Sequence, residues 1–394
     1  MNRNTFSDRQ KFFEQAPGVY LEKLFGQPQR KQFLTGVPVF LGMTAKMKPG
    51  THVMLSLWSH FSIHVGASKQ DPYLAYAVRG FFQNGGRRCY VVALANGEPL
   101  ALENGLHTIS KFNSVDLVCV PCLASPDLVK DRNLAFAMQQ MVVDHCEAMG
   151  DRFAILDSRR GDTDRQVADQ WSEIDGANGA IYYPWVKVRE LEGNELVIIP
   201  PCGHVAGVYA RTDEEHGWHK APANVVLRGV IGLEHELSNK EHGELNQKRV
   251  NCLRSFPGRG IRVYGARTLS GHDAWAYVNV RRLFLTAVRW MHWNMLDVVF
   301  EPHDATLWAR IERELHAYFT RVYRKGALKG ATPQEAFYIK CDAETNPREV
   351  YEAGRVVTEV GLAPANPFEF VIVRLICGES GVSISGPIRP EQNL

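Results

Sequence analysis

The chain ends with the stretch PFEFVIVRLICGESGVSISGPIRPEQNL, residues 367–394. Its first half combines aromatic and β-branched residues and predicts a strand that is buried in a sheet. A tail rich in Gly, Ser and Pro follows, at a place where chains usually fray. Such a strand needs a partner for its backbone N–H and C=O groups, and we expect a second copy of the chain to supply it.

The composition is that of an ordinary globular protein with two or three domains. Of the 394 residues, 45% are hydrophobic and 22% are charged, and the net charge is +2. This composition is not that of a disordered chain, and the net charge is too small to indicate a protein that binds polyanions. No apolar run approaches the ~20 residues of a membrane span, and residues 1–15 lack the apolar core of a signal peptide. We therefore expect folding in the cytoplasm, no nucleic-acid partner and no direct membrane insertion.

The eight cysteines are scattered, and most stand in apolar surroundings that predict buried free thiols. Cys119 and Cys122 form a C-x-x-C pair, which elsewhere serves as a redox dithiol or as half of a zinc site. The pair directly follows the apolar run VDLV, and no second C-x-x-C supplies further ligands. A structural role is favoured, and a redox or metal enzyme that uses this pair is kept as an alternative.

Apolar strands and helical patterns alternate along most of the chain. Residues 1–35 are polar and predict an arm with one short strand, Val19-Tyr20-Leu21. The order of the following segments implies βαβ units with a mostly parallel sheet. Strands are predicted at 37–44, 87–94, 115–123 and 152–157, and helices at 73–86 and 134–150. The segments 180–188, 195–201 and 204–212 continue this alternation. Residues 211–251 are polar and predict a loop-rich section.

The last third predicts an α+β arrangement with two amphipathic helices. In residues 278–299 one apolar face recurs at spacings of three and four, formed by Val280, Phe284, Ala287, Val288, Met291, Met295 and Val298. A second helix is predicted from about Ala305 to Lys325, with Asp304 as N-cap and Gly326 as its stop. Further strands are expected at 261–268, 336–342, 357–364 and 368–376.

The second helix carries a stripe of arginines. At 100° per residue, Trp308, Ile311, Leu315, Tyr318, Phe319 and Val322 fall on one side, which predicts the core face. Arg310, Arg313, Arg321 and Arg324 fall on the other side, with Lys325 after them. These residues form either a solvated face or a basic ridge that docks on an acidic partner.

No pattern of residues predicts catalysis. The chain has no phosphate loop, no G-x-S-x-G elbow and no H-E-x-x-H helix. Two histidines, His216 and His219, stand close in sequence to Asp213, Glu214 and Glu215, as the ligands of a metal site can. They fall in a Gly/Pro-rich segment that would not fix the ligand geometry, so a solvated loop is favoured. A polar surface is also favoured for Glu234, His235, Glu236, Glu241, His242 and Glu244. Asn84-Gly85-Gly86-Arg87-Arg88 stands after a helix and predicts its C-cap, because anion-binding loops precede a helix.

Five ordered motifs resemble those of contractile tail sheath proteins of phages, R-type bacteriocins and extracellular contractile injection systems. They are IRVYGARTLSG, WAYVNVRRLF, VVFEPHDATLWARI, GALKGATPQEAFYIKCD and VGLAPANPFEFVIVRL. The similarity is clearest over residues 260–376 and weaker over 17–45 and 74–156. The tail beyond Ile376 is longer than is usual in that family.

The resemblance implies an α/β and α+β fold in four parts. These are an N-terminal arm (1–35), an outer α/β domain with a subtilisin-like fold (36–259), an inner tube-facing α+β domain (260–367) and a C-terminal strand and arm (368–394). It also implies arm strands that pair with neighbouring subunits, at Val19, Tyr20, Leu21, Phe370, Val371, Ile372 and Val373.

The function implied is that of a sheath subunit, not an enzyme. The sheath polymerises helically around an inner tube and contracts to drive the tube through a target envelope. The implied partners are other copies of the chain, sister sheath proteins, the inner tube protein, and baseplate and tail-terminator proteins. Arg310, Arg313, Arg321, Arg324 and Lys325 would face the tube. No cofactor and no metal are expected, and the place of action is a phage tail or released particle assembled in the bacterial cytoplasm. A hydrolase with an unrecognised site is the other enzymatic alternative.

Overall fold

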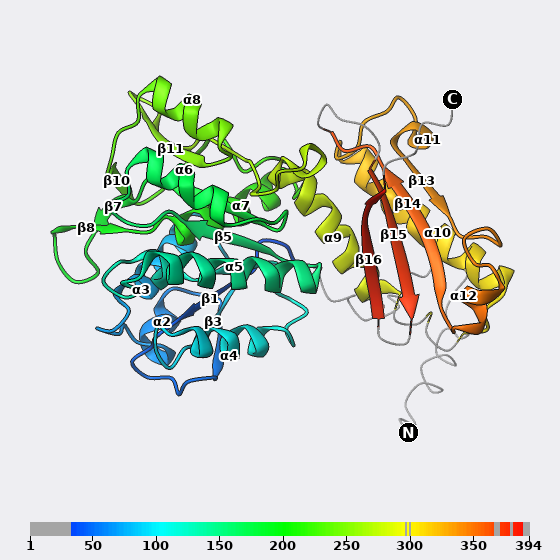
Figure 1. Cartoon of the computed structure of the whole chain (residues 1–394), viewed down its shortest axis with the longest axis horizontal. Coiled ribbons are helices and arrows are strands. Elements are labelled where there is room, and N and C mark those ends of the chain that lie inside the picture. The colour runs from blue at the N-terminus through cyan, green and yellow to red at the C-terminus, as the bar shows by residue number, and fades with distance from the viewer. Residues whose placement is uncertain (1–32, 296–297, 299–300, 366–370, 379–380, 389–394) are drawn as a thin grey trace, which may run out of the picture. The chain divides into compact units, whose positions relative to one another are not determined.

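A computed structural model of the chain describes residues 33–295, 298, 301–365, 371–378 and 381–388. The predicted strand Val19–Leu21 and Phe370 lie outside the described residues. Residues 35–394 form one compact unit, and the fold below belongs to it. Figure 1 labels most of its helices and strands.

A nine-stranded sheet forms the centre of the first part of the fold (Figure 1). Its order is β2-β3-β1-β4-β5-β6-β11-β12-β9, and the five pairs from β3 to β11 are parallel. The predicted βαβ units are therefore confirmed, with antiparallel strands only at the two edges. The strands are β1 (Pro38–Gly42), β2 (His52–Leu55), β3 (Cys89–Ala93), β4 (Leu117–Cys119), β5 (Phe153–Asp157), β6 (Gly179–Tyr183), β9 (Val225–Val226), β11 (Asn251–Phe256) and β12 (Gly260–Val263).

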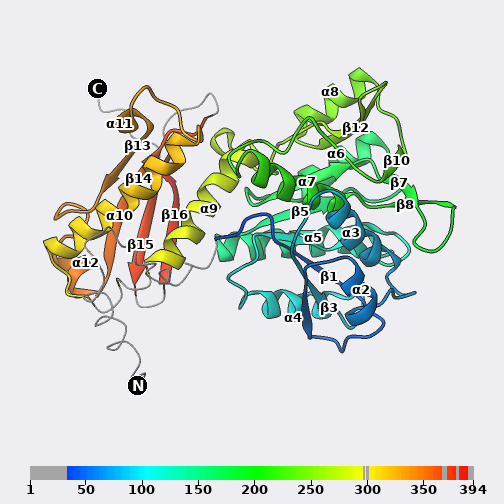
Figure 2. The same ribbon diagram turned by 180° about the vertical axis from the view of Figure 1, so that it is seen from behind.

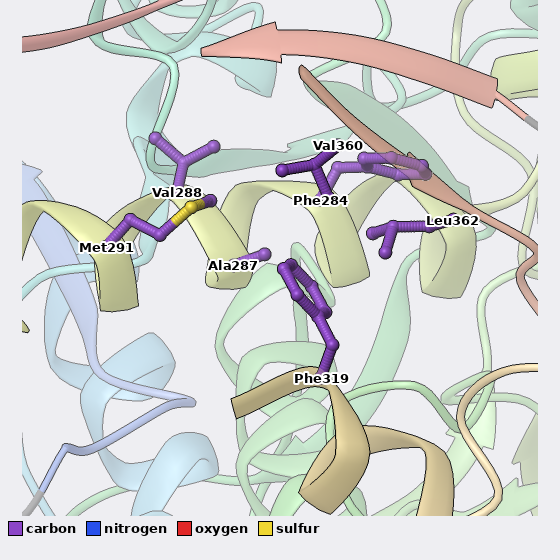
Figure 3. Close-up of a pocket in the computed structure, with 7 residues that line it drawn as sticks. All are labelled: Phe284, Ala287, Val288, Met291, Phe319, Val360 and Leu362. Atoms are coloured by element: carbon purple, nitrogen blue, oxygen red, sulfur yellow. The ribbon is translucent and has the colours of Figure 1, made fainter. Parts of the chain in front are cut away.

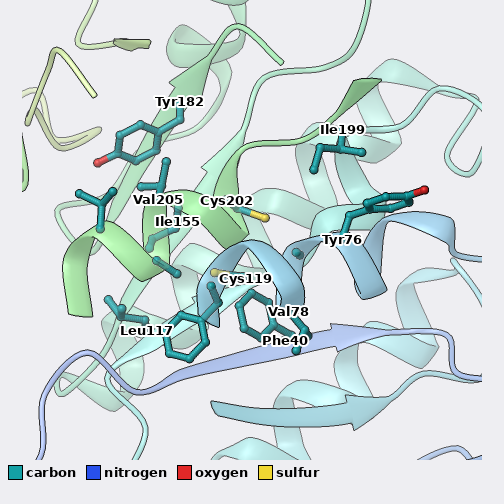
Figure 4. Close-up of a cluster of buried hydrophobic side chains, with 14 of the residues drawn as sticks. Phe40, Tyr76, Val78, Leu117, Cys119, Ile155, Tyr182, Ile199, Cys202 and Val205 are labelled. Carbon is teal, nitrogen blue, oxygen red and sulfur yellow. The ribbon is translucent and has the colours of Figure 1, made fainter. Parts of the chain in front are cut away.

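Helices cover both faces of this sheet, as the uninterrupted apolar runs of its central strands require. Figure 1 looks onto the face covered by α4 (Pro99–Ile109), α5 (Arg132–Met149) and α6 (Asp164–Glu173), and Figure 2 looks onto the face covered by α3 (Pro72–Gln83) and α7 (Cys202–Glu215). Successive residues of β1 alternate between the two cores: Phe40 belongs to the α3/α7 side, shown in Figure 4, and Val39 and Leu41 to the other.

Local signals explain where these helices begin and how they pack. The carboxylate of Asp71 accepts from the backbone N–H groups of Tyr73 and Leu74 and caps α3. α3 ends at Asn84, as the glycines after it predicted. Gly203 lies against the backbone of Ala77, so any side chain there would push α7 off α3. Small elements complete this part: α2 (Ser59–His64) and the 3-10 helix η1 (Pro121–Ala124). A second 3-10 helix, η2 (Asp273–Trp275), places Trp275 in the core of the last part of the chain.

The section predicted to be loop-rich contains more regular structure than expected. β10 (Val230–Leu233) joins β7 (Val186–Arg189) and β8 (Leu196–Ile199) in a three-stranded antiparallel sheet. α8 (Asn239–Gln247) begins with a capping box between Ser238 and Glu241. The prediction missed α8 because Leu245 is its only buried residue, so the helix carries no apolar periodicity. Residues 204–212 lie in α7.

The last part of the chain packs two helices against a four-stranded antiparallel sheet. The helices are α9 (Val278–Asn294) and α10 (Ala305–Arg324), and the sheet order is β13-β14-β15-β16. All seven apolar residues predicted for the first helix face are buried in this core. A void of about 10 Å³ among them is lined by apolar side chains only, so it offers no ligand site (Figure 3). The remaining elements are α11 (Pro333–Ala336), β13 (Phe337–Lys340), α12 (Arg348–Glu352), β14 (Val356–Leu362), β15 (Val371–Gly378) and β16 (Gly381–Ile388).

The partner of the C-terminal strand differs from the expectation. β15 pairs with β14 on one edge and with β16 on the other, so both of its neighbours come from its own chain. β16, from the Gly/Ser-rich tail, therefore occupies the edge of β15 at which we expected a strand from a second copy. The boundary predicted between residues 259 and 260 falls in the turn between β11 and β12.

Candidate functional site

The arginine stripe lies on α10, which is built as the sequence predicted. The carboxylate of Asp304 accepts from the N–H groups of Thr306 and Leu307 at 2.9 Å and caps the helix. Ile311, Leu315, Tyr318, Phe319 and Val322 are buried in the core, and Trp308 is half-buried. With that face inward, the arginine side of the helix faces outward.

The structure separates the predicted basic residues into two kinds. Arg313, Arg321 and Arg324 are exposed. Arg310 is half-buried and lies 3.3 Å from Glu301 and 3.5 Å from Glu314, so its charge is balanced within the chain. Lys325 is exposed and stands 5.1 Å from the ring centre of Trp218. Three arginines therefore remain as the charged ridge of α10.

An open groove of about 500 Å³ runs beside this ridge. Arg313 and His316 from α10 line one side, and Phe337, Tyr338 and Ile339 from β13 line the other. The outer edge of β13 pairs with no strand among the described residues. This face of the molecule thus combines positive charge with an open strand edge.

The predicted arm strands are only partly described. Val371, Ile372 and Val373 lie in β15, in register with Leu362, Gly361 and Val360 of β14. In the described part of the chain, the open edges of this sheet are β13 and β16. Sheet edges with unpaired backbone groups are the places where an added strand can bind.

A buried cluster of charges connects three distant segments, and sequence reasoning missed it. The guanidinium of Arg282 in α9 donates to both oxygens of Asp213 in α7, at 2.8 and 2.6 Å. Asp116 lies 3.3 Å from Arg282 and 3.5 Å from Arg289. The sequence predicts a solvated loop around Asp213, but this residue lies in the last turn of α7 and is 9% exposed.

Asp116 also holds the segment that leads into β1. Its carboxylate accepts from the backbone N–H of Gly36 at 2.9 Å and of Val37 at 2.6 Å. Gly36 has φ of +69° and lies against Ala210, so only glycine fits there without strain. Burial alone would lower the pKa of Arg282, but the carboxylates of Asp213 and Asp116 raise it above its ordinary value. Burial also raises the pKa of the Asp213 carboxyl group, and the hydrogen bonds from the charged guanidinium of Arg282 oppose that shift.

The cysteines and histidines that the sequence suggests as possible catalytic residues do not come together in a catalytic site in the described part of the chain. Cys119 and Cys122 are buried, and Cys119 belongs to the same apolar cluster as Cys202 (Figure 4). Burial raises the pKa of the Cys122 thiol well above its usual range, which opposes a reactive thiolate. All seven cysteines whose side chains the structure describes are free and buried, as predicted. His216 and Glu215 lie 4.0 Å apart on the surface.

One group of possible metal ligands does come together in the described residues. Asp164, His235 and Glu241 place their ligand atoms within 4.8 Å of one another. The sequence had singled out His235 and Glu241 but not Asp164, which is about 70 positions away. None of the described helices is long and apolar enough to cross a membrane.

Two family models match consecutive parts of the chain. The model described as the phage tail sheath protein central domain matches residues 103–269. The model described as the phage tail sheath C-terminal domain matches residues 271–376.

Similar proteins and structures carry the same description. The tail sheath protein of Salmonella phage ViI is 27% identical over 192 residues, which are 48% of this chain and 29% of that protein. The matches cover only 29% to 50% of the length of the curated relatives. A chain of the anti-feeding prophage (AFP) baseplate is 31% identical with a TM-score of 0.73, over 91% of this chain and 97% of that one. A chain of the PVC sheath complex in the contracted state is 27% identical with a TM-score of 0.72, over 90% and 95%.

These matches agree with the motifs, with the mixed sheet and with the expectation that the protein is structural rather than an enzyme. Three of the solved structures with the same fold are those of the AFP baseplate, the PVC sheath complex and the AFP helical sheath. The chain therefore belongs to the phage tail sheath protein family, which includes the sheaths of the AFP and PVC contractile injection systems.

Proposed function

We propose that this chain polymerises helically around an inner tube and contracts to drive the tube through a target envelope. The observation that carries the proposal is its similarity, over nine-tenths of its length, to AFP and PVC sheath proteins in contracted sheaths. The particle would be a phage tail or an extracellular injection device, assembled in the bacterial cytoplasm.

Contraction of such a sheath needs no nucleotide. If the extended lattice is strained, reorientation of the subunits releases interfacial free energy, and small differences add up over many copies. The absence of a phosphate-binding loop in the sequence is consistent with this mechanism.

The arms would keep subunits linked while their bodies move. We assign residues 1–35, with Val19, Tyr20 and Leu21, to a strand that extends the sheet of a neighbour. The open edges of β13 and β16 are suited to accept it, because strand addition satisfies their backbone groups. Val371, Ile372 and Val373 would then lie inside the sheet through which the subunits are joined.

The ridge of α10 would face the tube. Arg313, Arg321 and Arg324 are exposed and can meet acidic tube residues in the extended state. Exposed charge pairs contribute only ~0–1 kcal/mol each, so they can hold the tube collectively and still release it. Arg310 contributes less, because Glu301 and Glu314 already balance its charge.

In this proposal the nine-stranded sheet belongs to an outer, subtilisin-like domain (36–259), named for its fold. With these bounds, β12 (Gly260–Val263) is the one strand of that sheet that falls in the inner domain (260–367), which also contains α9, α10, β13 and β14. The C-terminal arm (368–394) contains β15 and β16, which complete the four-stranded sheet. Baseplate and tail-terminator proteins would bind the two ends of the polymer, and sister sheath proteins could share it.

Electron microscopy of the purified protein, alone and expressed together with its tube protein, tests this function. We expect rings or striated tubes, and co-expression should lengthen them. Monomers under both conditions would contradict the proposal, and so would an enzymatic activity that depends on Cys119 or Cys122.

A further inference from the structure

The cluster of Asp164, His235 and Glu241 lies where two helices of the α/β part meet. Asp164 is the first residue of α6, and Glu241 stands in the first turn of α8. His235 lies in the segment between β10 and α8. The two helices pack against each other (Figure 1).

Each carboxylate is oriented by a hydrogen bond that leaves its other oxygen available. The hydroxyl of Tyr183 donates to Oδ1 of Asp164 at 2.9 Å. The backbone N–H of Ser238 donates to Oε2 of Glu241 at 2.7 Å. Carboxylates that bind metals are commonly held by such outer partners.

No lysine or arginine among the described residues balances the two carboxylates of this cluster, and the imidazole of His235 lies beside them. Among the described residues, neither Asp164 nor Glu241 forms a salt bridge with a lysine or arginine. The positive end of each helix dipole stabilises the one carboxylate that lies at that helix's N-terminus. The two dipoles do not compensate for two carboxylates brought within 4.8 Å of each other and of an imidazole.

We propose that Asp164, His235 and Glu241 bind a divalent transition-metal ion that ties the start of α6 to the start of α8. One imidazole nitrogen and two carboxylate oxygens suit Zn²⁺, whose sites often combine three protein ligands with water. Ca²⁺ and Mg²⁺ are disfavoured because they prefer oxygen ligands throughout. His235 is exposed, so water can complete the coordination.

The test is titration of the full chain, freed of metal by a chelator, with Zn²⁺ in a calorimeter, followed by thermal unfolding with and without Zn²⁺. We expect one saturable site and a higher unfolding temperature in the presence of Zn²⁺. His235→Ala should weaken binding at least tenfold and abolish the thermal shift, and it should fold because the side chain is exposed. Glu241 is left intact because it also caps α8.

His216→Ala is the matched control, since it removes an exposed histidine from the other carboxylate-rich segment. It should bind Zn²⁺ as the parent does. Co²⁺ should give visible absorption in the parent and in His216→Ala but not in His235→Ala or Asp164→Asn. Absence of saturable binding in the parent, or unchanged binding by His235→Ala, would overturn the proposal.

Discussion

Arg282 is a buried cation that connects parts of the chain far apart in sequence. Its partners Asp213 and Asp116 come from α7 and from the start of β4, and Asp116 also holds the backbone of Gly36 and Val37. Helical periodicity places Arg282 on α9 but does not say which carboxylates will reach it. The loss of one partner leaves an uncompensated charge in the interior.

Asp213→Asn should therefore lower the free energy of unfolding by roughly 3 kcal/mol, because the amide removes one charge of a buried pair. Urea unfolding followed by circular dichroism measures this loss. Glu214→Gln is the control, since Glu214 and its partner Arg87 are exposed, and we expect a change below about 1 kcal/mol. Equal effects of the two substitutions would contradict the importance of burial.

The buried carboxyl group of Asp157 predicts how the stability of the fold changes with pH. Burial raises the pKa of its carboxyl group from 3.8 to about 7, although it accepts from the backbone N–H of Cys202 at 2.8 Å. Because the pKa is higher in the folded state, the stability from this group is present below about pH 4 and is lost as the pH rises through about 7.

Asp157→Asn keeps the acceptor and removes the ionisation. The variant should gain stability over the parent as the pH rises from 4 to 8, by on the order of a few kcal/mol at the upper end. Unfolding free energies at several pH values give this difference directly. A difference that stays constant over the range would show that Asp157 does not titrate as described.

At the scale of elements, α10 shows what an amphipathic pattern does and does not determine. The pattern correctly predicted the buried face, the N-cap Asp304 and the end of the helix before Gly326. The i,i+4 spacing of Arg310 and Glu314 can be read from the sequence, but the second partner, Glu301, lies before the helix and meets Arg310 only after the chain folds.

Reversal of the charge ridge tests its role in tube binding. The double substitution Arg313→Glu and Arg321→Glu should leave the circular dichroism and unfolding temperature of the subunit almost unchanged, since both side chains are exposed. It should reduce co-assembly with the tube, as measured by co-sedimentation. Assembly of the parent should also weaken with rising salt, because exposed charge pairs are screened.

The control for this experiment is Arg165→Glu with Arg259→Glu, two exposed arginines outside α10. The control should co-sediment with the tube as the parent does. Unimpaired assembly of the Arg313/Arg321 variant would show that the charged ridge of α10 does not contribute to tube binding.

At the scale of the whole molecule, β13 and β16 are the edge strands of the four-stranded sheet and pair with no further strand among the described residues. Deletion of residues 1–24 should leave the folded unit of residues 35–394 intact, with an unfolding temperature close to that of the parent. It should abolish polymerisation, because the proposed linking strand Val19–Leu21 is lost. Negative-stain microscopy of the two proteins distinguishes them, and normal sheaths from the shortened chain would refute the arm hypothesis.

The sequence by itself determined the local structure: the alternation of strands and helices, the burial of α9 and α10 and the free thiols. These features depend on periodicity, caps and composition within short windows. Motifs in the last third also identified the family. The helices α4, α6 and α8 were not predicted, and α8 shows the reason most clearly, because a polar helix held by its capping box has no apolar period.

Only the tertiary structure decided which distant residues meet. It placed β1 between β3 and β4, paired β15 with β16 of the same chain, and brought Arg282 to Asp213 and Asp164 to His235. Such contacts depend on the path of the chain between the partners, which short-range patterns do not encode. Their physical cause is the packing of whole helices and sheets, which buries charges and aligns strand edges at positions fixed by all the elements together.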